Sequence, residues 1–299
     1  MTMSWHSTLN AYSGRDCNDK WNRRYRRRIN RSGNRPARPE SHKITVIYVS
    51  LDFKDHFSGN SENYKKYRPE YPAELFSYLT SIASEHEIAW DCGTGSGQTA
   101  KGLVRFFKSV VASDPSRSQI ENAEEIKGIK YFVATAESST LENGTIDLIT
   151  VSQALHWFQI DSFFHEAERV LKPNGILAIW SYNLLSVTPD IDQIISHFYS
   201  KILGRYWPQE RKLVESGYRE ISFPFLEVTP PYFEMRAEWN LFELIGYIST
   251  WSAVKEFQSA TMVSPLDRLY EEIYPYWGEP SRKMAINWPL TLKIRKKVR

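Results

Sequence analysis

Cysteine is scarce in this sequence of 299 residues, which contains only Cys17 and Cys92. Two cysteines so far apart make neither a disulfide framework nor the paired spacing of a metal site, so we expect reduced thiols and no bound metal. No run of apolar residues approaches the roughly 20 needed to cross a bilayer, and the first residues lack the apolar core of a secretory signal. These absences predict a cytoplasmic protein that has no membrane partner.

Acidic residues are few at the start of the chain. Residues 1–40 hold ten Lys/Arg and three Asp/Glu, a net charge of +7, whereas the remainder holds 28 basic and 32 acidic residues, a net charge of −4. Many arginines with little apolar periodicity predict a disordered basic arm over residues 1–43. Such an arm can contact nucleic acid, but a solvated extension explains the charge run as well, and we expect no nucleic-acid partner.

Strand-like and helix-like segments alternate in the rest of the chain. Runs rich in apolar and β-branched residues are typical of strands, and they occur at residues 88–90, 109–114, 129–135, 146–154 and 176–180. Amphipathic segments of helical period lie between them, which predicts an α/β domain with a doubly wound, mostly parallel sheet. We expect one domain over residues 44–299, with a cofactor-binding core at about 85–181 and a cap and C-terminal strands at 182–299. In that last part, residues 232–239 and 290–295 alternate with the period of one-sided edge strands.

The stretch WDCGTGSGQTA, residues 90–100, places Gly93, Gly95 and Gly97 between a strand and a helix. In an open α/β sheet this turn lies where ligands bind, beyond the carboxyl ends of the strands. A dinucleotide fingerprint, G-x-G-x-x-G, would need a glycine where this chain has Gln98, so the pattern argues against a dehydrogenase. The loop therefore predicts a binding site for a ligand of another kind.

The pattern Asp91-x-Gly93-x-Gly95-x-Gly97 resembles the first motif of class I S-adenosylmethionine-dependent methyltransferases. SQALHWF and EAERVLKPNGILAIW look very like the type 11 members of that family. YKKYRPEYP and YISTWSAV resemble the small-molecule enzymes related to trans-aconitate methyltransferase, so the resemblance covers about residues 50–299. It implies a seven-stranded Rossmann-like sheet with an antiparallel edge strand and a helical, aromatic-rich cap. It also implies S-adenosylmethionine as the cofactor and a small-molecule acceptor, with a carboxylate or a hydroxyl group favoured.

The resemblance also implies which residues bind the cofactor. The glycine loop would wrap its methionine end, where the Asp91 carboxylate suits the ammonium group. Asp114 ends the second strand, where the family carries an acid that accepts hydrogen bonds from both ribose hydroxyls. Ala136 and Glu137 are expected beside the adenine, and Gln153 beside the cofactor or the loop backbone.

The acceptor side of the site rests on fewer signals. His156 follows the fourth strand and is either a general base or a structural hydrogen-bond donor, and the residues leave both roles open. Tyr64 and Arg68 are expected to form a lid over the site, in which Arg68 holds an anionic group. Trp157 and Trp251 are candidates for the wall of the acceptor pocket.

Two other functions stay open at this point. One is a non-catalytic protein that binds S-adenosylmethionine and regulates or scaffolds a partner, and the other is an RNA or protein methyltransferase that uses the basic arm. An exocyclic-amine methyltransferase would carry a [DNS]-P-P-[YFW] loop after the fourth strand, where this chain has Ser152-Gln153-Ala154-Leu155. We expect a monomer or a weak homodimer.

Overall fold

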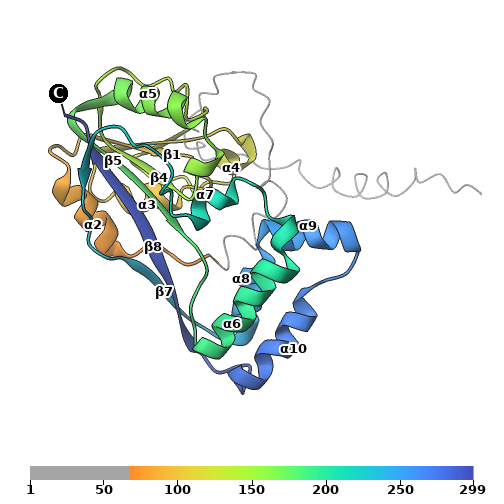
Figure 1. Cartoon of the computed structure of the whole chain (residues 1–299). Coiled ribbons are helices and arrows are strands. Elements are labelled where there is room, and N and C mark those ends of the chain that lie inside the picture. Colours follow the sequence, from red (N-terminus) through yellow and green to blue (C-terminus); the bar gives the residue numbers. More distant parts are fainter. Residues whose placement is uncertain (1–67, 299) are drawn as a thin grey trace, which may run out of the picture. The chain divides into compact units, whose positions relative to one another are not determined.

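The computed structural model describes residues 68–298, which fold around an eight-stranded sheet (Figure 1). The strand order is β3-β2-β1-β4-β5-β8-β6, and β7 also pairs with β8. The strands β1 to β5 run parallel to their neighbours, and β8 runs antiparallel to β5, β6 and β7. The strands are β1 (Ile88–Cys92), β2 (Ser109–Asp114), β3 (Ile129–Val133), β4 (Ile146–Ser152), β5 (Leu171–Tyr182), β6 (Leu226–Val228), β7 (Glu234–Trp239) and β8 (Met284–Lys296).

The predicted fold class is confirmed: the sheet is Rossmann-like and mostly parallel, with antiparallel strands at one edge. The described residues form eight strands instead of the expected seven because β8 is long enough to pair with both β6 and β7. Its first half, residues 284–289, pairs with β7, and residues 290–296 pair with β5. The sequence pattern predicted only the second half, since Pro289 interrupts the apparent strand. The proline is exposed and donates no ladder hydrogen bond, which a strand tolerates at an edge.

Helices cover both faces of the parallel strands, and the strand sequences show why. Successive residues in β1 and β4 belong to different apolar clusters: Ala89 and Leu148 contribute to one cluster, and Trp90 and Ile149 to the other. Because successive side chains of a strand point to opposite faces, both faces are buried. The helices of this part are α2 (Ala73–Ile82) and α3 (Gln98–Leu103), which pack in the first cluster, α5 (Ile160–Val170), which packs in the second, and α4 (Arg117–Glu121).

Two segments of the second half of the chain form a helical cap, as the aromatic-rich sequence predicted. Figure 1 shows α6, α8, α9 and α10 gathered to the right of the lower part of β7 and β8. The cap elements are α6 (Pro189–His197), the π-helix η2 (Phe198–Ile202), η3 (Gly204–Tyr206), α8 (Leu241–Ser249), α9 (Ser252–Thr261) and α10 (Leu266–Trp277). The short helix α7 (Arg211–Glu215) follows η3 and packs in the second apolar cluster through Val214. Together with the sheet, these elements bury a large part of the aromatic content of the chain.

Several boundaries differ from the sequence expectations. Strand β5 begins at Leu171, before the expected start at Ile176, because Leu171 already pairs with Ile146. The register then shifts, and the extra residues, 172–175, belong to β5. The helix after β2 ends at Glu121, earlier than its apolar pattern indicates. The predicted arm, residues 1–43, and the first residues of the predicted domain, 44–67, lie outside the described residues, so the proposed domain division stays a prediction. No helix within residues 68–298 is long and apolar enough to cross a membrane.

Candidate active site

A cavity of about 260 Å³ opens beyond the carboxyl ends of β1, β2 and β4. The loops that follow these strands and β3 form one side of it, and the cap forms the other. Of the residues that the sequence predicted for the site, the cavity wall brings together Arg68, Gly93, Gly95, Asp114, Ala136, Glu137, Gln153, His156, Trp157 and Trp251. Asp91 and Gly97 do not line it, and Tyr64 lies outside the described residues.

All three glycines of the loop have left-handed φ values, of 69°, 56° and 91° for Gly93, Gly95 and Gly97. A Cβ added to Gly93 would stand 2.6 Å from the Cβ of Ala154, and one added to Gly97 would meet the Tyr131 hydroxyl. A Cβ on Gly95 would find only the Gln119 side chain, at 3.9 Å. Two of the glycines are therefore needed for packing within the protein, and Gly95 alone leaves open space over its backbone in the cavity.

The Asp91 carboxylate lies beneath the loop and is fully buried. Its oxygens accept hydrogen bonds from the Thr94 hydroxyl, from the Ala100 backbone N–H at 3.1 Å and from the Thr150 hydroxyl at 3.0 Å. Burial raises the pKa of Asp91 to about 6, although these three hydrogen bonds act in the opposite direction. Asp91 therefore ties the loop to β4 and to the start of α3, and its expected role near the cofactor ammonium stays a prediction.

Asp114 ends β2 and lines the cavity with only 8% of its surface exposed. One carboxylate oxygen accepts the Gly95 N–H at 2.9 Å, and the other accepts the Ser116 N–H at 2.9 Å. These two backbone bonds orient the carboxylate and connect it to the open part of the glycine loop. The sequence placed Asp114 here because an acid at the end of a parallel strand reaches the same edge as the loop after the neighbouring strand.

Gln153 follows β4 and carries an acceptor that the described residues leave unpartnered. Its φ of 52° is unusual for a residue with a side chain. The side-chain N–H donates to the Tyr182 carbonyl at 2.8 Å, while the Oε1 atom is buried and has no hydrogen-bond partner within residues 68–298. A buried acceptor without a donor is costly, so an N–H group of a ligand in this cavity would satisfy it.

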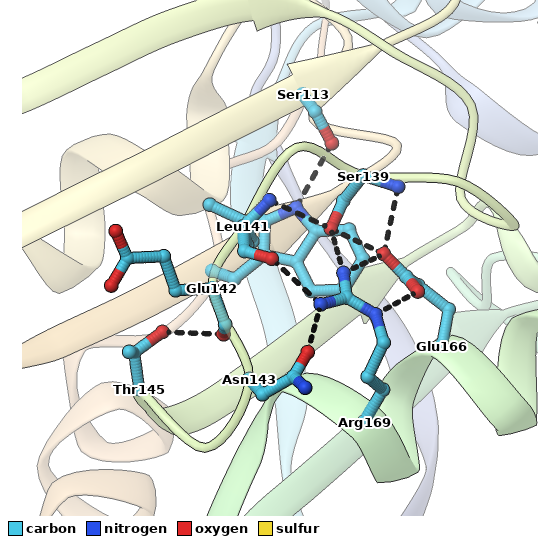
Figure 2. A network of polar contacts seen from close by, with 9 residues as sticks. Ser113, Ser139, Leu141, Glu142, Asn143, Thr145, Glu166 and Arg169 are labelled. Carbon is cyan, nitrogen blue, oxygen red and sulfur yellow. Dashed lines mark hydrogen bonds and ion pairs between the residues drawn. The ribbon is translucent and has the colours of Figure 1, made fainter.

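The loop after β3 carries Ala136 and Glu137 to the cavity, and a polar network holds the segment that follows (Figure 2). The Glu166 carboxylate on α5 accepts from the Ser139 N–H at 2.8 Å and from Arg169 at 2.6 and 2.7 Å. Arg169 also donates to the Leu141 carbonyl at 2.8 Å. Burial alone would raise the pKa of Glu166, but the hydrogen bonds from Arg169 and Ser139 outweigh it and lower the pKa. The network anchors residues 139–141 and so positions Glu137 two residues before them.

His156 lies in the short helix η1 (Leu155–Trp157) and is 8% exposed. Its Nδ1 atom is 3.2 Å from the Tyr218 hydroxyl, and its ring packs 4.9 Å from that of Trp157. Burial and, to a smaller extent, the positive charge of Arg211 lower the pKa of His156 to about 3. The imidazole is therefore neutral at physiological pH and is a weak base. Of the two roles that the sequence left open, this environment favours the structural one.

The cap side of the cavity contains residues that sequence reasoning missed. Trp207, Arg211, Tyr247 and Lys255 line it together with Trp251. They come from the segment after η3 and from α7, α8 and α9, which have no shared motif, so only the tertiary contacts bring them together. Tyr247 and Trp251 lie in YISTWSAV, which the sequence had singled out, and Trp207 contributes only to the high aromatic content. No sequence signal pointed to Arg211 or Lys255.

Arg68 enters this side from just before α2. Its Nε atom donates to the Tyr182 hydroxyl at 3.0 Å, and its guanidinium lies over the Tyr182 ring at 6.0 Å. Arg68 is thus held at the end of β5, where it lines the cavity. Its predicted lid partner Tyr64 is outside the described residues, so the lid itself stays a prediction.

The known proteins to which this chain is similar are methyltransferases. Residues 90–179 match the type 11 family model that is described as a methyltransferase domain. A protein of Dictyostelium discoideum that is named as a methyltransferase is 36% identical over 258 residues, and the match covers 84% of this chain and 98% of that protein. An uncharacterized methyltransferase of Schizosaccharomyces pombe is 31% identical over 230 residues, which cover 73% of this chain and 88% of the relative.

A solved structure extends the similarity to the fold. A protein from Anaeromyxobacter dehalogenans, described as a type II methyltransferase, superposes with a TM-score of 0.74 at 38% sequence identity. The match covers 77% of this chain and 98% of that one. The similarity therefore reaches beyond the 90 residues or so of the family model into the cap and the C-terminal strands.

Proposed function

This chain belongs to the class I S-adenosylmethionine-dependent methyltransferases, and on that premise we propose that it methylates a small-molecule acceptor on a carboxylate or a hydroxyl group. The observation that carries the proposal is the cavity in which the loops after β1 to β4 face aromatic and cationic side chains of the cap. A concave site of this size, with mostly apolar walls and a few polar groups, suits a small molecule.

S-adenosylmethionine is the cofactor, and the residues of the cavity fit it. The open backbone at Gly95 admits close approach of a ligand, and the unpartnered Gln153 Oε1 can accept a hydrogen bond from the ammonium group. We propose that Asp114 holds the ribose hydroxyls and that Ala136 and Glu137 flank the adenine. When bound, the cofactor supplies a methyl group already activated on a sulfonium.

Because the donor is already activated, the remaining task of the protein is to align the acceptor and to exclude water. Trp157 and Trp251 line the cavity, and we propose that they contact the acceptor. The low pKa of His156 makes it a poor general base at neutral pH, so His156 orients the acceptor or the loop instead. A carboxylate acceptor needs no base, since it is ionised at neutral pH. The electrostatics of His156 therefore favour the carboxylate over the hydroxyl.

We further propose that the acceptor is the only partner the reaction requires, with no nucleic acid or membrane, and that the protein is a monomer or a weak homodimer. The competing assignment to an RNA or protein substrate depends on the arm, residues 1–43, which lie outside the described residues. Deleting these residues should leave the rate of methyl transfer to a small-molecule acceptor unchanged. A loss of activity that is restored by adding back the arm would reject this part of the proposal.

The direct test is to incubate the protein with methyl-labelled cofactor and a metabolite extract. We expect one labelled small molecule and an equal amount of S-adenosylhomocysteine, identified by mass spectrometry. Asp114→Ala should remove both, and heat-inactivated protein controls for background transfer. If label enters only RNA or protein when these are supplied with the extract, the proposed acceptor class is wrong.

A further inference from the structure

Two cationic side chains, Arg211 of α7 and Lys255 of α9, line the cavity, and neither forms an ion pair within residues 68–298. Both are half-buried. The carboxylates that line the same cavity, Asp114 and Glu137, lie on the sheet side, where each accepts backbone N–H groups. The cavity wall is therefore negative on the side proposed for the cofactor and positive on the side of the cap.

Arg211 is held in place before any ligand arrives. Its Nε atom donates to the Tyr199 hydroxyl at 3.0 Å, and its guanidinium lies 5.0 Å from the centre of the Trp207 ring and 5.7 Å from that of Tyr199. The terminal nitrogens have no acceptor within residues 68–298. A guanidinium anchored through Nε presents these two nitrogens as a fork, which matches the geometry of a carboxylate.

Lys255 adds a second positive charge from α9, and its side-chain ammonium makes no hydrogen bond or ion pair with any described residue. A partly desolvated cation without a counter-ion is unfavourable, and an anion in the cavity would offset that cost. The two cations come from separate elements, α7 and α9, and the cavity is the space that both of them line.

The neighbouring wall is aromatic. The ring centres of Trp207 and Trp251 are 5.7 Å apart, and those of Trp251 and Tyr247 are 6.1 Å apart. All three residues line the cavity. Such rings offer large apolar surfaces against which a planar or hydrocarbon body packs favourably.

We propose that Arg211 and Lys255 bind a carboxylate of the acceptor while Trp207 and Trp251 bind its apolar body, so that the acceptor is an amphipathic organic acid. The inference rests on the proposed function, since it names the class of acceptor for the same site. It adds two specificity-determining residues, Arg211 and Lys255, that the family motifs do not include.

The test is calorimetric binding with matched probes. Indole-3-acetate and indole-3-acetamide share an aromatic body and differ in charge, and acetate supplies the charge without the body. Each is titrated at up to millimolar concentration into the full-length protein with and without S-adenosylhomocysteine. We expect the acid to bind at least about 10-fold more tightly than either the amide or acetate, because the charge-assisted bonds and the aromatic contact act together.

Variants separate the two cations from general charge effects. Lys255→Met keeps the apolar stem and should weaken binding of the acid by about 10-fold while leaving binding of the amide unchanged. Arg211→Gln should have an effect at least as large, and its thermal unfolding reports whether α7 remains folded. Lys212→Met is the matched control, since Lys212 is an exposed neighbour in α7 that does not line the cavity, and it should change neither affinity.

Equal affinity for the acid and the amide, no detectable binding of the acid, or unchanged binding of the acid in both Lys255→Met and Arg211→Gln would each overturn the inference. The proposed function fails on a different result: a wild-type protein that does not bind S-adenosylhomocysteine. If the wild-type protein does not bind S-adenosylhomocysteine but still binds the acid more tightly than the amide, the anion site is supported and the methyl-transfer assignment is rejected.

Discussion

Single residues set the conditions for binding in the glycine loop. Gly95 differs from its two partners because its missing side chain leaves space in the cavity instead of space for another protein group. The Asp114 carboxylate, bonded to the Gly95 N–H, lies next to this opening. Gly95 thus combines a left-handed backbone, an N–H group fixed by its bond to Asp114 and a backbone surface that lines the cavity.

Substituting the glycines should separate binding from stability. Gly95→Ala should lower the free energy of unfolding by about 1–2 kcal/mol through left-handed strain and should weaken cofactor binding, because the new methyl group points into the cavity. Gly93→Ala should cost about 3 kcal/mol, since its methyl group also clashes with Ala154. Calorimetric affinity and chemical denaturation check both variants. An unchanged cofactor affinity in Gly95→Ala would show that the cofactor does not lie against this loop.

His156 and Asp91 should give opposite contributions to the pH dependence of stability. The pKa of His156 is about 3 in the folded chain and has a reference value of 6.5, so the unfolded state binds the proton first and stability falls as the pH drops from 6.5 towards 3. The pKa of Asp91 is about 6 against a reference value of 3.8, so stability falls as the pH rises from 3.8 to 6. Between pH 4 and 6 the two effects largely cancel.

Replacing His156 should reveal this cancellation. In His156→Gln only the Asp91 contribution remains. As the pH rises from 4 to 6, the free energy of unfolding of this variant should therefore fall, relative to that of the wild type, by about 1.4 kcal/mol for each pH unit. Denaturant unfolding at several pH values measures the difference, and His197→Gln, at an exposed histidine of α6, serves as the control. Turnover at pH 7 to 8 should fall less than about 10-fold, since a neutral imidazole is not acting as a strong base. A larger loss together with a disappearing basic limb in the pH–rate profile would restore the general-base role.

At the scale of secondary-structure elements, helix α5 connects the second apolar cluster to the cofactor side of the cavity. Its apolar face packs on the sheet through residues such as Phe163 and Ala167. Its buried acidic side chain, Glu166, binds Arg169 and the segment after β3 (Figure 2). The position of the segment that carries Glu137 therefore depends on the polar residues of a helix that does not itself line the cavity.

Glu166→Gln should destabilise the protein and weaken cofactor binding together. The amide can accept fewer of the hydrogen bonds from Arg169 and Ser139 and loses the charge, which should lower the free energy of unfolding by about 1–3 kcal/mol. Glu168→Gln, on the exposed face of the same helix, should change stability by less than about 0.5 kcal/mol. Unfolding curves and cofactor titrations report the two effects, and a stable variant with normal affinity would show that the network does not position this segment.

At the scale of the whole described molecule, β8 joins the sheet to the cap. Trp288 in its first half is fully buried, packs 5.1 Å from the Trp239 ring and donates to the Tyr247 hydroxyl at 3.2 Å. Tyr247 in turn lines the cavity. The same strand therefore pairs with β5 in the sheet and supports the wall proposed for the acceptor.

Trp288→Ala should disturb both the sheet and the cap wall of the cavity. Removing this buried ring should cost about 3–5 kcal/mol of stability and should weaken acceptor binding more than cofactor binding, because the cavity forms beside Tyr247. Tyr276→Ala on the cap surface, where the ring is 56% exposed, is the control and should be nearly neutral. Thermal unfolding and separate titrations with cofactor and acceptor distinguish the outcomes. Equal losses of both affinities would mean that the cap and the cofactor loops respond as one unit.

Much of the fold could be read from local pattern. Alternating strands and helices predicted the parallel sheet. Successive apolar residues in a strand, such as Ala89 and Trp90, must be buried on opposite faces, and helices on both sides of a parallel sheet cover them. The glycine loop and Asp114 were located because their positions follow from strand ends, which are local features. Local pattern could not predict the part of β8 before Pro289, since this first half is stabilised by pairing with β7 and not by its own sequence.

The sequence by itself therefore determined the class of fold, the family and the edge of the sheet at which the site lies, because these depend on periodicity and on motifs of neighbouring residues. Only the tertiary structure decided that Asp91 supports the loop from below, that His156 is neutral, and that Arg211 and Lys255 share a cavity wall with tryptophans. Burial and long-range contacts set these properties, and neither is encoded in the spacing of adjacent residues.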